Sequence, residues 1–272
     1  MNHRHSSHFF LPALLFLIVL ITLFTSCAPN PSLDSDIIPV CSATFPDLVV
    51  MEAKPFDAKA SEEAQRKGYP ALEVYVDNGN LCIKQCENSN VCLLPANDGH
   101  LYGVDCGEFG GYVAYCRSDT YNTFSPVLLC NENCQALIQV NFQEYYAITG
   151  LAHMFSNFGS VYRLTYSSEN AQWSAEKLVD LGGRAWAHVY DEGNGLLYLS
   201  VANRGLLCMD AQGELTTVAT HEDWYDVGAN SLVLLEGKLF FGGANGIGRY
   251  SFDTKELTFF PMDYETYWEK NE

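Results

Sequence analysis

The feature that most constrains the fold is a repeat that returns after 42 residues. Gly195–Gly205 reads GLLYLSVANRG and Gly237–Ile247 reads GKLFFGGANGI, with glycine, leucine, alanine and asparagine at matching positions. At the same offset Glu214-Leu215 corresponds to Glu256-Leu257. Short runs of Val, Leu, Tyr and Phe, separated by turn pairs such as Asn78-Gly79, indicate antiparallel hairpins. Each repeat is therefore expected to be a small antiparallel sheet.

A period of about 40–45 residues with four strands per copy is typical of β-propeller blades. Two looser copies come earlier: Gly159–Leu181 corresponds to the second hairpin of a blade, and Gly99–Cys116 to an inner hairpin. Residues 69–272 hold roughly five such periods. The sequence therefore predicts an all-β chain that resembles β-propellers, with about five four-stranded blades.

The resemblance is to β-propellers in general, because no WD or GH signature of the WD40 class is present. A β-sandwich, which also uses short antiparallel strands, is the alternative fold. Residues 41–50, CSATFPDLVV, are expected to supply an outer strand that closes the ring.

The N-terminus has the order of an export signal. A polar start with Arg4 precedes Phe9–Phe24, sixteen uncharged and mostly apolar residues, which is shorter than the roughly 20 residues of a membrane-spanning helix. Thr25-Ser26-Cys27 follows and resembles the lipobox of bacterial lipoproteins, although Phe24 stands where that motif usually has Leu, Val or Ile. The resemblance implies that Cys27 becomes the first mature residue and carries a diacyl lipid. An uncleaved N-terminal anchor is the alternative.

This organisation divides the chain into four parts. Residues 1–26 are expected to be the signal peptide, 27–40 a flexible tether, 41–68 an N-terminal segment with a short helix, and 69–272 the propeller. The helix is expected at Asp57–Gly68, as a surface decoration, because a capping Asp, early acidic residues and a terminal Gly are typical helix boundaries. Two acyl chains hold a protein firmly to a bilayer, so we expect a membrane-anchored protein facing the extracytoplasmic side.

Composition limits the partners. The 272 residues are 48% hydrophobic, enough to bury a core in a single domain. The 33 acidic residues against 15 basic ones give a formal net charge of −18, which repels phosphate backbones and makes nucleic acid an unfavourable partner.

The cysteines do not indicate a metal site. Nine remain besides Cys27, and the Cys-x3-Cys spacing of CIKQC and CNENC differs from that of zinc knuckles. We expect no metal and no cofactor. Disulfides between neighbouring strands and small buried side chains are both compatible with the pattern.

Candidate ligand-binding residues fall in two places. Trp186 and His188 are expected just before an inner strand, and the loop HEDWYDVGAN before the last blade holds His221, Asp223, Trp224, Tyr225 and Asp226. Aromatic rings beside carboxylates can stack on a sugar and bind its hydroxyls. The oxygen-rich loop could also hold calcium, although it lacks the EF-hand spacing. The alternative is a solvated acidic loop whose aromatic rings pack on the blade below.

Catalysis has less support in the sequence. No Gly-x-Ser-x-Gly, His-Glu-x-x-His or phosphate-binding glycine loop is present. Asp105, Asp191 and Asp226 are carboxylate candidates for a glycosidase, whereas His100 and His153 are interpreted as packed strand residues. The leading hypothesis is a non-catalytic lipoprotein whose propeller binds a protein or glycan partner; a glycan hydrolase and an envelope scaffold are the alternatives.

Overall fold

The computed structural model describes residues 40–271, apart from 43, 46, 47, 49, 88 and 118–125. These residues belong to one unit, Pro39–Glu272. The apolar segment, Cys27 and most of the expected tether lie outside the described residues, so their assignments stay predictions. Within the described part of the chain no helix combines the length and the apolar character needed to cross a membrane.

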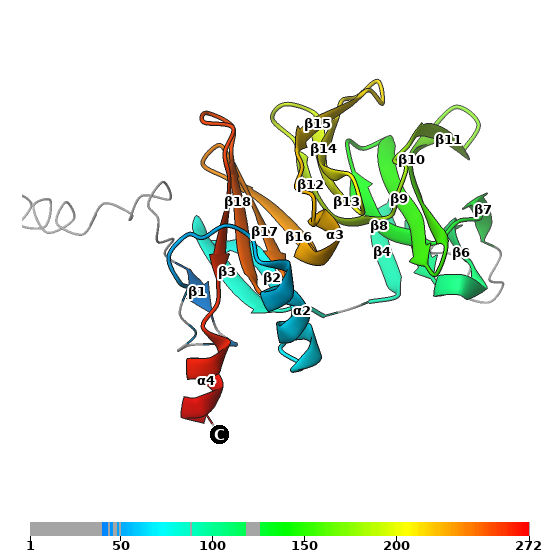
Figure 1. The fold of residues 1–272 in the computed structure, drawn as a ribbon. Coiled ribbons are helices and arrows are strands. Elements are labelled where there is room, and N and C mark those ends of the chain that lie inside the picture. The colour runs from blue at the N-terminus through cyan, green and yellow to red at the C-terminus, as the bar shows by residue number, and fades with distance from the viewer. Residues whose placement is uncertain are drawn as a thin grey trace, which may run out of the picture. The chain divides into compact units, whose positions relative to one another are not determined.

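The described residues form five sheets (Figure 1). Four of them have four strands: β4 (Val91–Ala96), β5 (Gly99–Asp105), β6 (Gly111–Arg117) and β7 (Val127–Cys130); β8 (Cys134–Gln139), β9 (Glu144–His153), β10 (Ser156–Ser167) and β11 (Gln172–Asp180); β12 (Ala185–Asp191), β13 (Leu196–Val201), β14 (Gly205–Met209) and β15 (Leu215–Ala219); β16 (Ser231–Leu235), β17 (Lys238–Gly243), β18 (Gly246–Ser251) and β19 (Leu257–Pro261). The fifth has three: β1 (Cys41–Ser42), β2 (Leu72–Asp77) and β3 (Asn80–Gln85). The helices are α2 (Ala58–Arg66), α3 (Trp224–Val227), α4 (Tyr264–Asn271) and the 3-10 turn η1 (Gly107–Phe109).

Each four-stranded sheet is an antiparallel meander, in which every strand pairs with the next one along the chain. The first strands contact one another in turn, β4 with β8, β8 with β12, β12 with β16, and β16 with β2. They are therefore the inner strands, as in the blades of a propeller. The predicted all-β propeller fold with about five sheets is confirmed; the sheet β1–β3 differs by having only three strands, one of them parallel to its neighbour.

The core lies between neighbouring sheets. One cluster joins Leu101 of β5 to Tyr145 of β9, a second joins Ile148 of β9 to Leu199 of β13, and a third joins the sheet β12–β15 to Phe241 of β17. Burying apolar side chains on both faces of a sheet is what fixes the order of the blades.

The aligned repeats occupy equivalent positions. Gly195 and Gly237 both adopt positive φ, 67° and 70°, in the turns that join the first and second strands of their sheets. Leu197 and Leu239, two residues later in each repeat, are both fully buried. Gly159–Leu181 contains the expected second hairpin, β10 and β11. The prediction for Gly99–Cys116 was wrong in one respect, because β5 and β6 are the second and third strands of their sheet and the inner strand β4 precedes them.

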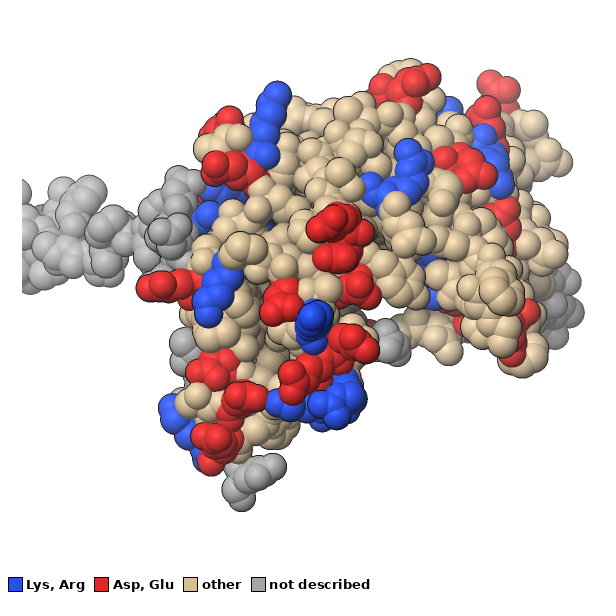
Figure 2. All heavy atoms as spheres, in the orientation of Figure 1, with Lys and Arg blue, Asp and Glu red and all other residues tan. Residues whose placement is uncertain are grey.

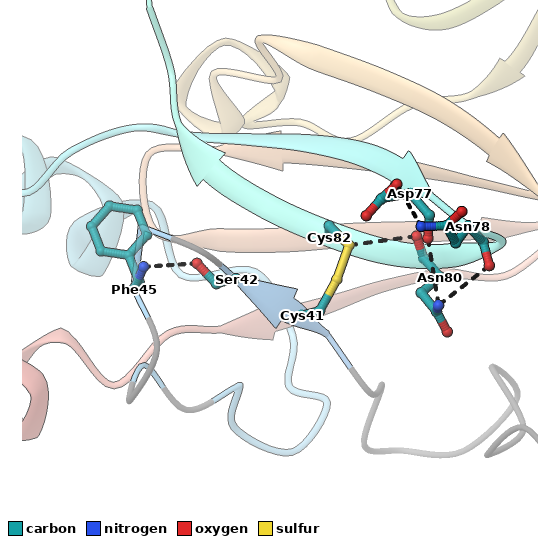
Figure 3. Close-up of a disulfide and its surroundings, with 7 residues drawn as sticks. All are labelled: Cys41, Ser42, Phe45, Asp77, Asn78, Asn80 and Cys82. Atoms are coloured by element: carbon teal, nitrogen blue, oxygen red, sulfur yellow. Dashed lines mark hydrogen bonds between the residues drawn. A yellow bond between two sulfur atoms is a disulfide. The ribbon is translucent and has the colours of Figure 1, made fainter.

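The N-terminal segment joins the first sheet and the last. Cys41–Ser42 pairs in parallel with β3, and a Cys41–Cys82 disulfide fixes it there (Figure 3). Met51 N donates to Pro261 O and Lys54 N to Phe259 O, both at 2.9 Å, so this segment also runs along β19. The expectation that residues 41–50 supply an outer strand is confirmed for the sheet β1–β3, where β1 is the edge strand.

Helix α2 forms where the sequence predicts it. Asp57 caps its N-terminus, accepting hydrogen bonds from Lys59 N at 3.0 Å and Ala60 N at 3.2 Å. The helix is more than a surface decoration, because Ser61 and Ala64 are buried and Ser61 Oγ donates to Asp226 O at 2.8 Å. Helix α2 therefore holds the loop that contains α3.

The starts of the inner strands lie on one side of the sheets together with α2 and α3, and we call this side the entry face. It comprises the ends at which β2, β4, β8, β12 and β16 begin, together with α2 and α3 (Figure 1, lower edge). Contacts link the strand starts directly: Cys92 Sγ near the start of β4 donates to Gln135 O near the start of β8, and Ser231 Oγ at the start of β16 accepts from Val74 N in β2. Side chains at these positions belong to a single surface.

Candidate functional site

An aromatic pair lies at the junction of two sheets on the entry face. The ring centroids of Trp186 and Tyr225 are 5.0 Å apart in an edge-to-face arrangement. Trp186 is the second residue of the inner strand β12, not a residue before it as expected. Tyr225 belongs to α3 and is 55% exposed. The pair therefore offers a partly open aromatic surface.

The other residues of the α3 loop point in different directions. Trp224 is 1% exposed and packs against Phe241, so it belongs to the core. The His221 ring packs edge-on against Phe56, with centroids 5.5 Å apart, and its Nδ1 accepts from Asp223 N at 3.1 Å. The backbone oxygen of Asp226 is bonded to α2, while its side chain is exposed.

His188 lies further along β12 and is half-buried. Burial lowers its pKa to about 4, because removing water disfavours the charged imidazolium. The ring is therefore neutral at physiological pH. His188 is separate from the aromatic pair and shares no ring contact with it among the described residues.

A polar cluster joins three sheets at the same face. Asp105, at the end of β5, accepts from Gln135 Nε2 at 2.9 Å and lies 3.3 Å from Arg184 Nη2. Gln135 also donates to Gly150 O at 3.0 Å. The Asp105 and Arg184 side chains are 14% and 30% exposed. This arrangement gives Asp105 a cation and an amide as partners, which suits a structural carboxylate.

The three carboxylates considered for sugar cleavage do not converge. Asp191 lies at the opposite end of β12, where it accepts from Gly193 N and Asn194 N and stabilises the β12–β13 turn. Asp105 ends β5 and Asp226 belongs to α3, both on the entry face. Retaining and inverting glycosidases need two carboxyl groups within about 10 Å of one another across one sugar, and a strand of seven residues separates its ends by roughly 20 Å.

Among the described residues, two carboxyl groups have a shifted pKa, Asp98 and Glu132, and in both the pKa is lowered. Burial by itself would raise the pKa of Glu132, but hydrogen bonds from Thr149, Tyr162 and Lys177 outweigh it. The hydrogen bond that Tyr115 donates holds the pKa of Asp98 below its usual range. A general acid needs the opposite direction. Among the described residues no three His, Cys, Asp or Glu side chains cluster so as to hold a metal ion.

A cavity of about 410 Å³ lies on the entry face over the last sheet, which is within the range of small-ligand sites. Its apolar wall combines the N-terminal segment with β18 and β19. The residues of that wall include Phe56, Ile247, Phe259 and Met262. His221 packs on two of these rings, Phe56 and Phe259, so the α3 loop reaches the cavity as well.

Charged side chains at the rim of the cavity are paired with one another. Lys67 Nζ lies 2.7 Å from Glu265 Oε1 and 3.3 Å from Glu63 Oε1. Hydrogen bonds to these two carboxylates raise the pKa of Lys67. Figure 2 shows acidic and basic side chains gathered over α2 in this region. The ion pairs connect α2 with α4 and leave the aromatic wall as the most distinctive part of the cavity.

Sequence reasoning missed a group of exposed apolar side chains on the entry face. Met154 and Phe155 form the two-residue turn between β9 and β10, with Met154 86% exposed and Phe155 fully exposed. Phe109 in η1 is 86% exposed and Phe158 in β10 is 41% exposed. His153 Nδ1 lies 3.4 Å from Glu108 Oε2, which brings the hairpin beside η1. We call Phe109, Met154, Phe155 and Phe158 the apolar tip.

A signal for the apolar tip is present in the sequence. Two-residue hairpin turns favour Asn-Gly or Asp-Gly, because the first position has positive φ. Met154 has φ of 52°, a conformation that disfavours a residue with a long side chain. An apolar pair in place of a turn pair marks a position where the side chains serve another purpose than the turn.

Comparisons with known proteins give weak likenesses. No protein-family model matches the sequence, and no curated protein matches it. Three solved structures are similar: the WD40 β-propeller domain of Doa1 (14% identity, TM-score 0.36, 46% of this chain and 39% of that chain), the tricorn protease (11%, 0.41, 64% and 18%) and the GH74 enzyme of Niastella koreensis (14%, 0.40, 57% and 27%). The chain thus spans less than half the length of each of these proteins.

Proposed function

We propose that this chain is a lipid-anchored, extracytoplasmic propeller protein that binds a protein partner through its entry face, without catalysis. The observation that carries the proposal is the apolar tip, where side chains of high exposure project from η1 and the β9–β10 hairpin. Large exposed apolar side chains close together are typical of protein interaction sites. Aromatic residues and methionine are enriched at such interfaces.

The anchor is supported by the sequence alone. Thr25-Ser26-Cys27 directly follows the apolar run, and diacylation of Cys27 would keep the propeller at the outer face of the membrane. To test it, full-length wild type and Cys27→Ala are expressed in a bacterial host, and intact mass and membrane partition are measured. We expect a diacylated wild type lacking residues 1–26 and an unprocessed variant. Retention of residues 1–26 without lipid in both proteins would refute the anchor.

The interface is tested by replacing the Met154-Phe155 turn with a pair of residues that the two-residue turn favours. Met154→Asn combined with Phe155→Gly supplies a favoured turn pair, so stability is expected to stay equal or to rise by up to about 1 kcal/mol. Partners captured in intact cells by cross-linking and identified by mass spectrometry should be lost from this variant. The matched control is Phe142→Ser, which removes an exposed ring, 72% exposed, from the β8–β9 turn at the opposite ends of the strands.

A glycan is the second candidate, favoured by the Trp186–Tyr225 pair beside Asp223 and Asp226. Stacking on an exposed ring and hydrogen bonds to carboxylates are the usual basis of sugar binding. Binding of purified cell-wall glycan fragments is measured by calorimetry for wild type and for Tyr225→Ala. If Tyr225→Ala abolishes glycan binding and the Met154→Asn, Phe155→Gly variant retains it, the glycan proposal replaces the protein-partner proposal.

A further inference from the structure

Two cysteines meet between the first pair of four-stranded sheets. Cys92 lies on the inner strand β4 and Cys134 starts the inner strand β8, two strands that are in contact. Cys92 Sγ donates to Gln135 O at 3.4 Å, next to Cys134 in the chain. Cys134 Sγ donates to Ala136 O at 3.5 Å, a residue of the same strand. The two cysteines therefore lie beside each other at the boundary between the two sheets.

Gly103 makes room for this contact. It pairs with Cys92 in the β4–β5 ladder. A Cβ atom at position 103 would lie 2.7 Å from Cys134 Cβ and 3.4 Å from Cys92 Cβ, in addition to overlapping the Cys134 sulfur. Both cysteine side chains thus occupy the space above this glycine. Disulfide formation needs the two Cβ atoms to come to roughly 3.5–4.5 Å from each other, and the absence of a side chain at Gly103 leaves the space for that approach.

The two thiols differ in reactivity. The neighbouring Cys134 lowers the pKa of Cys92, against the burial that raises it, while the neighbouring Cys92 and burial raise the pKa of Cys134. Cys92 is half-buried, whereas Cys134 is 2% exposed. Cys92 is consequently the thiol that ionises first and that a small molecule reaches.

We propose that Cys92 and Cys134 are a dithiol site that a small external disulfide oxidises to a second disulfide, linking the sheet β4–β7 to the sheet β8–β11. The Cys92 thiolate attacks one sulfur of the external disulfide, forms a mixed disulfide and releases one thiolate. Cys134 loses its proton to solvent and attacks Cys92 Sγ, which breaks the mixed bond and releases the second thiolate. Two protein thiols are oxidised and one external disulfide is reduced to two thiols.

A neighbouring thiol defines the alternative pairing. Cys130, at the end of β7, is buried, and burial raises its pKa to about 11. It belongs to the same buried cluster of side chains as Cys134. Cys130 is nevertheless less suited to attack an external disulfide, because it is buried and less ionised than Cys92. A Cys130–Cys134 bond is therefore the outcome that the experiment must separate from the proposed one.

The test uses the full chain with oxidised glutathione. Wild type is incubated with and without it at pH 8, remaining thiols are alkylated, and peptides are mapped by mass spectrometry without reduction. We expect a cross-linked peptide containing Cys92 and Cys134, with a loss of about 2 Da relative to the two thiol peptides. Alkylation of both cysteines after oxidation, or a Cys130–Cys134 peptide in its place, would overturn the proposal.

Variants give an independent readout. Cys92→Ala should abolish the cross-link, whereas the matched control Cys86→Ala, a half-buried cysteine following β3, should keep it. Oxidation should raise the melting temperature of wild type and of Cys86→Ala by roughly 5–10 °C and leave that of Cys92→Ala unchanged. An equal rise in Cys92→Ala would contradict the assignment. If Cys92→Ala does not fold, the peptide map of wild type still decides the question.

Discussion

At the scale of single residues, His188 is a half-buried base inside the strand β12. Its folded-state pKa of about 4 lies below the roughly 6.5 of an unfolded chain. Between these values the unfolded chain binds more protons than the folded one, so stability falls as the pH drops. The loss begins near pH 6.5 and is complete below about pH 4.

We predict that His188→Gln removes this acid sensitivity. Glutamine does not titrate, so the free energy of unfolding of the variant should change less between pH 7 and pH 4, by up to roughly 3 kcal/mol. Urea unfolding at several pH values measures it. His153→Gln is the control, because His153 is 43% exposed; an unchanged pH profile in His188→Gln would contradict the assignment.

Residue-level predictions from sequence fail where neighbours in the chain point in opposite directions. Trp224 and Tyr225 are adjacent in HEDWYDVGAN, yet one is in the core and the other is exposed. Both residues lie in the short helix α3, which directs their side chains to different sides. A single helical turn has too little hydrophobic periodicity to show which side faces the core. The sequence shows which residue types the loop contains. The direction of their side chains depends on the packing of Trp224 against Phe241.

At the scale of elements, the capped start of α2 is the best-defined local feature. Asp57→Ala removes the acceptor for two backbone amides and should lower the free energy of unfolding by about 1 kcal/mol. Because α2 lines the cavity, fraying of its first turn should also increase amide hydrogen exchange there. Glu62→Ala, at an exposed position of the same helix, is the matched control and should leave both unchanged.

Elements governed by local chemistry were predictable. Asn78-Gly79 forms the β2–β3 turn, with φ of 49° and 79°, as expected for a pair that tolerates positive φ. The outer strands β15 and β19, which belong to different sheets, start at Leu215 and Leu257, equivalent positions of the repeat. In contrast, β1 has two residues and a parallel partner, so neither alternation nor turn residues could show its bounds within residues 41–50 or its pairing.

At the scale of the whole described unit, the Cys41–Cys82 disulfide secures the N-terminal segment to the first sheet. Cys41→Ala should lower the free energy of unfolding by roughly 2–4 kcal/mol, because the bond restricts a loop of 41 residues in the unfolded chain. Thermal unfolding measures the loss. Cys86→Ala serves as the control, and an equal loss there would show that the effect is not specific to this disulfide.

The order of the sheets was predictable from the repeat, but their contacts at the entry face were not. The period of 42 residues predicts blades that pack on their neighbours. The apolar tip depends on η1 lying beside the β9–β10 hairpin, and the cavity depends on residues 51–69 lying against the last sheet. Both are long-range contacts between loops, which no local pattern encodes.

The pairing of the N-terminal segment with β19 has a consequence for synthesis. Met51 and Lys54 find their backbone partners at Pro261 and Phe259 of β19, which is synthesised long after them. At roughly 5–20 residues per second the segment waits on the order of 10–40 s without its native neighbours. The pairing of this segment is therefore completed only after β19 has been synthesised, and a chain interrupted before Leu257 keeps the segment available to proteases and chaperones.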